Sequence, residues 1–129
     1  MKQLFLQKKL VEIRLKKSLG QNFLIDQNIL KKIVSIDIFK NGSEIVEIGP
    51  GSGNLTEYLI KSNPKKIFAI EKDEILAKNL SERFHKKINV INADILKFTD
   101  NKIFTNETIV IGNLPYNISS QILVKFILN

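Results

Sequence analysis

The stretch Glu44–Gly53, EIVEIGPGSG, decides the fold that the sequence predicts. Its first half, Glu44–Ile48, is a short apolar run with β-branched residues, which is typical of a buried strand. In its second half, Gly49–Gly53, glycine alternates with proline and serine, so the backbone can take positive φ and bring N–H groups close to a ligand. The spacing is G-x-G-x-G, which differs from the dinucleotide pattern G-x-G-x-x-G because Asn54 follows. We therefore expect a strand, a glycine turn and then a helix.

The same alternation of strand and helix continues on both sides of this stretch. An Asn-Gly pair at 41–42 separates it from an earlier helix that Asp26 can cap. Further strands are expected at Ile67–Ile70, Ile88–Ile91 and Thr108–Ile111, and further helices after Gly53, from Asp73 and over Ile118–Leu128. Strands that alternate with helices indicate crossover units. The predicted fold is therefore α/β, with a parallel sheet and helices on both of its faces.

Composition excludes several classes of function. The 129 residues allow one domain, and they include no cysteine and a single histidine, His85. Disulfide scaffolds, thiolate metal sites and cysteine nucleophiles are therefore excluded, and histidine-based metal sites or triads nearly so, which leads us to expect no metal. No apolar run approaches the roughly 18 residues of a membrane span, and charges interrupt the N-terminus. We expect a cytoplasmic protein without a membrane segment.

The net charge of +7 is unevenly distributed along the chain. Residues 1–40 contain nine basic and three acidic side chains, whereas the remaining residues contain eleven and ten. A basic arm on a nearly neutral body suggests an anionic polymer as partner, because phosphates attract such a segment. The alternative interpretation is a lysine-rich solvated surface, and charge alone favours this alternative.

Two acidic residues stand at the ends of predicted strands. Glu71 follows the second strand, 22 residues after Gly49, where its carboxylate can accept hydrogen bonds from both hydroxyls of a ribose. Asp94 follows the third strand, where it can accept from an adenine amino group. One acidic residue at a strand end is usually a helix cap. Together with the glycine turn, however, they lie at the carboxyl ends of strands, where open α/β sheets bind ligands.

The segment Asn113-Leu114-Pro115-Tyr116 follows the fourth predicted strand and suits a planar nitrogen heterocycle. The side-chain carbonyl of Asn113 and a neighbouring backbone carbonyl can accept hydrogen bonds from an exocyclic amine. Tyr116 can stack on the ring, and such stacking contributes roughly 1–3 kcal/mol per base. The alternative is a loop with a capping asparagine and a core tyrosine.

These motifs resemble those of a known family. EIGPGSGNLT, the strand-end Glu71, the NAD at 92–94 and NLPYNISSQI resemble S-adenosylmethionine-dependent methyltransferases that act on adenine N6. KKSLGQNFLID, at Lys16–Asp26, narrows the resemblance to the ribosomal RNA adenine dimethylases of KsgA type. The resemblance implies a Rossmann-like methyltransferase fold, here truncated after its fourth strand. It also implies N6 dimethylation of two adjacent adenosines in a loop near the 3′ end of 16S small-subunit rRNA.

The resemblance also implies a role for individual residues. Asn113 and Tyr116 would be catalytic, with Tyr116 stacking on the target base. The implied S-adenosylmethionine-binding residues are Asn22, Leu24, Gly49, Glu71, Asp94 and Asn113.

The resemblance divides the chain into a basic arm with a cofactor-covering segment, residues 1–25, and a partial methyltransferase domain, residues 26–129. The expected partner is rRNA in the small ribosomal subunit, and we expect a monomer. Two alternatives stay open. One is the related 23S rRNA adenine methylase that confers antibiotic resistance. The other is a truncated, inactive piece that binds RNA or cofactor without turnover.

Overall fold

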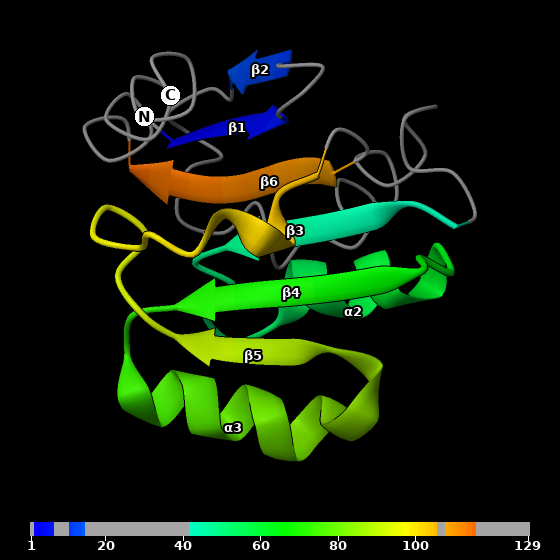
Figure 1. Ribbon diagram of the computed structural model, residues 1–129, viewed down its shortest axis with the longest axis vertical. Coiled ribbons are helices and arrows are strands. Elements are labelled where there is room, and N and C mark those ends of the chain that lie inside the picture. The colour runs from blue at the N-terminus through cyan, green and yellow to red at the C-terminus, as the bar shows by residue number, and fades with distance from the viewer. Residues whose placement is uncertain (1, 7–10, 15–41, 106–107, 116–129) are drawn as a thin grey trace.

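A computed structural model describes residues 2–6, 11–14, 42–105 and 108–115. The expected helices that begin at Asp26 and at Ile118 lie outside the described residues. One six-stranded sheet, in the order β2-β1-β6-β3-β4-β5, organises what is described (Figure 1). The strands are β1 (Lys2–Leu6), β2 (Val11–Arg14), β3 (Glu44–Ile48), β4 (Lys66–Glu71), β5 (Asn89–Asn92) and β6 (Thr108–Pro115). The helices are α2 (Asn54–Lys61), α3 (Glu74–Phe84), and the 3-10 turns η2 (His85–Lys87) and η3 (Asn101–Ile103).

The four predicted strands are confirmed as β3, β4, β5 and β6, and they pair in parallel. Ile48 at the end of β3 pairs with Ile70 of β4 on one side and with Gly112 of β6 on the other. The carboxyl ends of the central strands therefore meet at one edge of the sheet. This edge carries the loops in which the sequence predicts a ligand site.

The N-terminal arm contributes two strands that the sequence analysis did not predict. β1 and β2 form an antiparallel pair, and β1 also pairs antiparallel with β6, as Figure 1 shows beside the orange strand. β6 is correspondingly longer than expected. Its pairing with β3 ends at Gly112, whereas Asn113–Pro115 continue as strand residues opposite β1, with Asn113 against Leu4. The prediction that the fourth strand ends before Asn113 is therefore wrong, because β1 supplies a partner for the extra residues.

Local signals in the sequence account for the ends of the two α-helices. The Asp73 carboxylate accepts a hydrogen bond from the Leu76 N–H at 2.9 Å and so caps α3, as predicted. α2 ends at Lys61, and Asn63 then takes a positive φ of 58° directly before Pro64. Asparagine tolerates this left-handed conformation better than most residues, so the chain can turn into β4.

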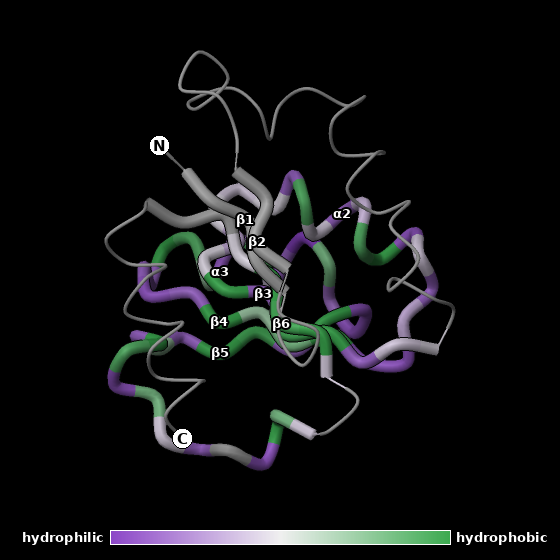
Figure 2. Tube along the Cα trace, turned by 90° about the horizontal axis from the view of Figure 1, so that it is seen from above, coloured by the Kyte–Doolittle hydropathy of each residue, from purple (hydrophilic) through white to green (hydrophobic). Residues whose placement is uncertain are grey.

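The core lies on both faces of the sheet because side chains alternate along each strand. Ile45, Ile67 and Ile111 face α2 and α3, which pack on the same face through residues that include Leu59 and Leu80. The opposite face is covered by the segment between β5 and β6. On this face the strands contribute Val46, Ile48, Ile70 and Val110, and the covering segment contributes Ile95, Phe98 and Phe104. In Figure 2 the middle parts of β4 and β5 are hydrophobic, whereas α2 is of mixed hydropathy.

Within the described ranges, no helix has the length and apolar character that crossing a bilayer requires.

Candidate cofactor site

The glycine turn between β3 and α2 has the backbone conformation that its composition predicts. Gly49, Gly51 and Gly53 have φ values of 66°, 60° and 88°, a region that residues with a Cβ rarely adopt. The Gly49 N–H donates to the Ile70 carbonyl at 2.9 Å, and the Gly53 N–H donates to the Pro50 carbonyl at 3.0 Å. A Cβ on Gly51 would meet no atom within 4 Å. The turn is therefore fixed at both ends, and its middle faces open space.

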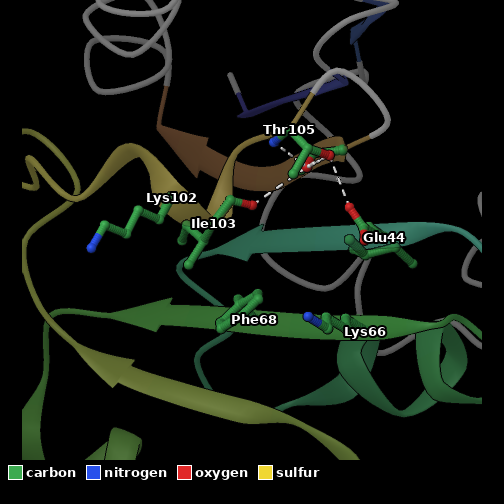
Figure 3. Close-up of a pocket in the computed structure, with 8 residues that line it drawn as sticks. Glu44, Lys66, Phe68, Lys102, Ile103 and Thr105 are labelled. Carbon is green, nitrogen blue, oxygen red and sulfur yellow. Dashed lines mark hydrogen bonds between the residues drawn. The ribbon is translucent and has the colours of Figure 1, made fainter.

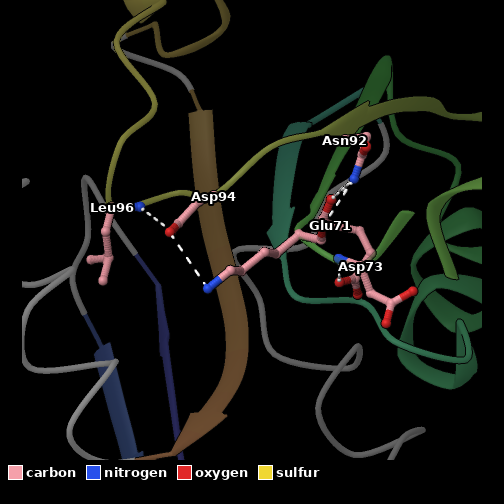
Figure 4. Close-up of polar contacts among 6 residues, drawn as sticks. Glu71, Asp73, Asn92, Asp94 and Leu96 are labelled. Atoms are coloured by element: carbon pink, nitrogen blue, oxygen red, sulfur yellow. Dashed lines mark hydrogen bonds and ion pairs between the residues drawn. The ribbon is translucent and has the colours of Figure 1, made fainter. Parts of the chain in front are cut away.

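Glu71, at the end of β4, joins this turn to the beginning of α3. Its side chain is buried, with Oε1 accepting from the Gly51 N–H and Oε2 from the Asp73 N–H, each at 2.9 Å. Figure 4 shows Glu71 beside Asp73. Because a carboxylate oxygen can accept two hydrogen bonds, each oxygen retains capacity for a hydroxyl donor. Glu71 can therefore hold the turn and a diol at the same time.

Asp94 lies after β5, the strand next to β4. Its Oδ1 accepts from the Leu96 N–H at 3.0 Å, and its Oδ2 lies 3.7 Å from the Lys72 ammonium (Figure 4). The Asn92 amide donates to the carbonyl oxygens of Glu71, at 3.0 Å, and of Lys72, at 3.1 Å. These bonds tie the ends of β4 and β5 together. The Asp94 carboxylate consequently has one oxygen that accepts from the backbone and one that faces an exposed ammonium group.

Glu47 is a buried acid in this region that the sequence analysis did not single out. It lies on the helix-facing side of β3 and accepts a hydrogen bond from the hydroxyl of Thr56 in α2. Burial raises the pKa of Glu47 to about 7, the Thr56 hydrogen bond opposes this rise, and the nearby Glu71 charge adds to it. The signal was available in the sequence, because EIVEI places an acid where strand alternation puts Ile45 on the same buried face.

The structure brings together three of the predicted site residues and leaves the others untested. Gly49, Glu71 and Asp94 lie at the carboxyl ends of the adjacent strands β3, β4 and β5. The backbone of Asn113 follows Gly112, the β6 residue that pairs with the end of β3. The Asn113 side chain is not described. Asn22, Leu24 and Tyr116 lie outside the described residues, so their predicted roles stay predictions.

A hollow is found at the opposite, amino-terminal edge of the sheet (Figure 3). It is lined by residues of β3, β4 and the segment before β6, among them Lys66, Phe68 and Lys102. Its carboxylate, Glu44, already accepts a hydrogen bond from the Thr105 hydroxyl at 2.8 Å. Lys102 points away from Glu44 in Figure 3. The polar groups therefore do not converge on one point, and we place the candidate site at the carboxyl-end edge.

Across the described segments, no three His, Asp or Glu side chains gather in a way that could hold a metal ion. The acidic groups at the carboxyl-end edge are instead bonded to backbone N–H groups and to Lys72. This arrangement suits an organic ligand that offers hydrogen-bond donors.

Comparison with known proteins gives consistent results. The profile of the family described as Ribosomal RNA adenine dimethylase matches residues 12–129. Ribosomal RNA small subunit methyltransferase A of Pelagibacter ubique is 56% identical over 117 residues, which cover 91% of this chain and 44% of the relative. The chain thus spans less than half the length of this relative.

Two solved structures resemble the described fold. A dimethyladenosine transferase from Plasmodium falciparum is 29% identical, with a TM-score of 0.67 over 81% of this chain and 38% of the other. The 23S rRNA methyltransferase ErmE is also 29% identical, with a TM-score of 0.62 over 76% of this chain and 39% of the other. The parallel sheet with its glycine turn is therefore a Rossmann-like methyltransferase fold. Because the family profile matches residues 12–129, which is nearly the whole chain, the chain belongs to the ribosomal RNA adenine dimethylases.

Proposed function

We propose that this chain forms the cofactor-binding part of an enzyme that dimethylates N6 of adjacent adenosines in 16S rRNA, with S-adenosylmethionine as methyl donor. The observation that carries the proposal is the buried Glu71 carboxylate, held by the Gly51 and Asp73 N–H groups at the carboxyl-end edge of the sheet. Asp94 follows β5, the strand next to β4. The family membership makes a methyltransferase reaction the chemistry that this edge would serve.

The residues at this edge fit the groups of a nucleoside cofactor. Glu71 would accept hydrogen bonds from the two ribose hydroxyls through its remaining lone pairs. The Oδ2 of Asp94 would accept from the adenine amine, displacing the exposed Lys72 ammonium. The open space above Gly51 would let the turn approach the ligand closely. When bound, S-adenosylmethionine supplies an electrophilic methyl group on a cationic sulfur.

Asn113 and Tyr116 would handle the target base. The adenine N6 lone pair is delocalised into the ring, so the enzyme must improve and aim this nucleophile. Asn113 would accept a hydrogen bond from the N6 amine and align the nitrogen with the methyl carbon, while Tyr116 would stack on the ring. The base has to be unpaired or flipped out of a helix to reach these residues. These roles rest on the family resemblance.

The proposed partner is rRNA in the small ribosomal subunit, in the cytoplasm, with the enzyme acting as a monomer. The name of the Pelagibacter ubique relative, a small-subunit rRNA methyltransferase, supports this substrate. The six basic residues among residues 1–25 give the N-terminal arm the charge to contact phosphates.

Calorimetric titration with S-adenosylmethionine tests the cofactor site. We expect the chain to bind one equivalent. Replacement of Glu71 by alanine should weaken binding by ~1.5–3 kcal/mol, because two hydroxyls lose a charged acceptor. Glu74→Ala is the matched control, since Glu74 is an exposed acid in the first turn of α3. Absence of binding by the unmodified chain, or equal losses in both variants, would contradict the proposal.

The second candidate substrate is 23S rRNA. It is favoured by the likeness to ErmE, whose identity to this chain equals that of the dimethyladenosine transferase. The two candidates separate in a methyl-transfer assay with the chain extended to the length of its relatives. Methylation of small-subunit particles with protein-free 23S RNA left unmodified supports the first candidate. The reverse pattern supports the second.

A further inference from the structure

Arg83, near the end of α3, reaches across to the glycine turn. Its Nη1 donates to the Ser52 carbonyl oxygen at 2.8 Å, and its Nη2 donates to the Glu57 carboxylate at 2.9 Å. Ser52 lies within the turn, and Glu57 lies in the first turn of α2. One guanidinium group thus joins three segments, and its planar fork is suited to two acceptors at once.

The contact between α3 and the turn is also close at Gly53. A Cβ at Gly53 would lie 2.9 Å from both Leu80 Cδ2 and Phe84 Cε2. The Arg83 guanidinium lies 4.7 Å from the Phe84 ring centroid, so the aromatic ring supports it from one side. The last turns of α3 therefore form the surface on which the glycine turn rests.

We propose that Arg83 is a positioning residue that holds the glycine turn in the conformation that receives the cofactor. The inference deepens the proposed function and rests on it. Arg83 fixes the Ser52 carbonyl, and this oxygen belongs to the peptide unit whose N–H is that of Gly53. It therefore also sets the plane of the Gly53 N–H, which donates to Pro50 within the turn. Gly51, whose N–H meets Glu71, lies inside this fixed segment.

A purely structural role predicts a different outcome from a positioning role. The Arg83 and Glu57 side chains are 44% and 47% exposed, and exposed ion pairs contribute little to global stability. Removing the guanidinium should therefore leave the thermal midpoint nearly unchanged. The change should instead appear locally, as faster opening of residues 49–57, and in ligand affinity.

Two replacements of Arg83 and one control variant separate the contributions of the arginine. Arg83→Met keeps a long apolar stem against Phe84 but removes both donors. Arg83→Lys retains one cationic donor group without the planar fork, and should rescue part of the effect. Lys78→Met is the matched control, because Lys78 is an exposed cation of the same helix.

The first measurement is amide hydrogen exchange in the free chain, which does not depend on cofactor binding. We expect roughly five- to tenfold faster exchange in the peptide 49–57 for Arg83→Met, an intermediate rate for Arg83→Lys, and no change for Lys78→Met. Unchanged exchange in Arg83→Met would overturn the inference, whatever the chain binds.

The second measurement is calorimetric titration with S-adenosylmethionine. We expect the affinity to fall roughly five- to tenfold in Arg83→Met, with the thermal midpoint equal to that of Lys78→Met. Equal affinity of Arg83→Met and the unmodified chain would overturn the inference while leaving the cofactor site intact. If the unmodified chain binds no S-adenosylmethionine, the proposed function fails, and the positioning role fails with it even where exchange shows the turn to be held.

Discussion

The Gly51 N–H donates to the Glu71 carboxylate at 2.9 Å, which links the glycine turn after β3 directly to the end of β4. The carboxylate that would receive a ribose is thus already part of the backbone framework of the turn. A second N–H, from Asp73, holds the other oxygen. Ligand binding at Glu71 and the conformation of the turn are therefore coupled through a single side chain.

Replacing Glu71 by glutamine should separate the effect of the negative charge at this position from the effect of the side-chain shape. The amide keeps one acceptor oxygen, but its nitrogen cannot accept, so one of the two backbone N–H groups loses its partner. We expect S-adenosylmethionine affinity to fall about tenfold and the chain to lose about 1–3 kcal/mol of stability. Calorimetry and denaturant unfolding measure these two effects. A glutamine variant with unchanged affinity would show that the charge of Glu71 is not used for the ligand.

Stability should decrease as the pH rises, because the pKa of Glu47 is raised to about 7 in the folded chain. The folded state binds a proton that the unfolded state, with a pKa near 4.5, releases between these values. The stability that comes from keeping Glu47 protonated is therefore fully present below the unfolded pKa and is lost as pH rises through 7. The loss amounts to roughly 3 kcal/mol. Urea unfolding at a series of pH values from 5 to about 8.5 gives the slope.

Glu47→Gln should remove this slope. The glutamine oxygen can still accept from Thr56, and no charge is then buried at alkaline pH. Glu57→Gln, at an exposed position in α2, serves as control and should keep the slope. Parallel pH profiles for the unmodified chain and Glu47→Gln would show that Glu47 is not the titrating group.

Two glycines of the turn should respond differently to alanine. At Gly53 a Cβ would meet Leu80 and Phe84 at 2.9 Å, and the φ of 88° is unfavourable as well. Overpacking and backbone strain together should cost about 2–4 kcal/mol. At Gly51 only the φ of 60° opposes the change, so the expected cost is about 1 kcal/mol. Thermal unfolding of both variants measures the difference, and equal costs would mean that the contact with α3 is not close.

Asp94→Asn should reduce the preference of the cofactor site for adenine over hypoxanthine. Its oxygen can still accept from the Leu96 N–H, but the amide now offers a donor where Oδ2 offered an acceptor. We expect weaker binding of S-adenosylhomocysteine, by about tenfold, and a smaller loss for the inosyl analogue, whose ring presents an oxygen there. Competition titrations with the two compounds measure the ratio. Lys72→Met is the control and should change either affinity less than about twofold, because its ammonium is exposed.

Asn113→Ala should act mainly on turnover in a chain extended to the length of its relatives. The lost acceptor concerns the alignment of the target amine, so kcat should fall more than the RNA affinity. Tyr116→Phe should be mild because the stacking ring remains, whereas Tyr116→Ala should weaken base binding by ~1–3 kcal/mol. Methyl incorporation into small-subunit particles measures both effects. Full turnover by Asn113→Ala would end its assigned catalytic role.

The parallel strands and the strand-end acids could be predicted from the sequence, because each is specified by a short contiguous stretch of residues. EIVEI, IFAI and the glycine turn each carry their own signal, and Asp73 is followed at the right distance by the Leu76 N–H that it caps. β1 and β2 were not predicted, because charged residues in 1–17 obscure the alternation and the partner strand β6 is distant in sequence. Pairing with β1 also explains why β6 continues through Asn113.

Side-chain contacts between elements were beyond sequence reasoning. The bonds of Arg83 to Ser52 and of Glu71 to Gly51 join residues 31 and 20 positions apart, and no spacing rule indicates them. Glu47 was predictable as buried from alternation, but its partner Thr56 depends on how α2 packs on β3. The roles of Asn22, Leu24 and Tyr116 stay predictions.

The strand order has a consequence for how the nascent polypeptide assembles. β3, β4 and β5 can pair as they leave the ribosome, because strands that are consecutive in the sequence are also neighbours in the sheet. β6 is made last of the four and must insert at the other side of β3. Until then, the backbone of β3 presents an unpaired edge. The core also lacks the side chains of Val110 and Ile111, which are completely buried in the finished sheet. Such an edge pairs readily with foreign strands, so slow translation between β5 and β6 should favour aggregation or chaperone capture.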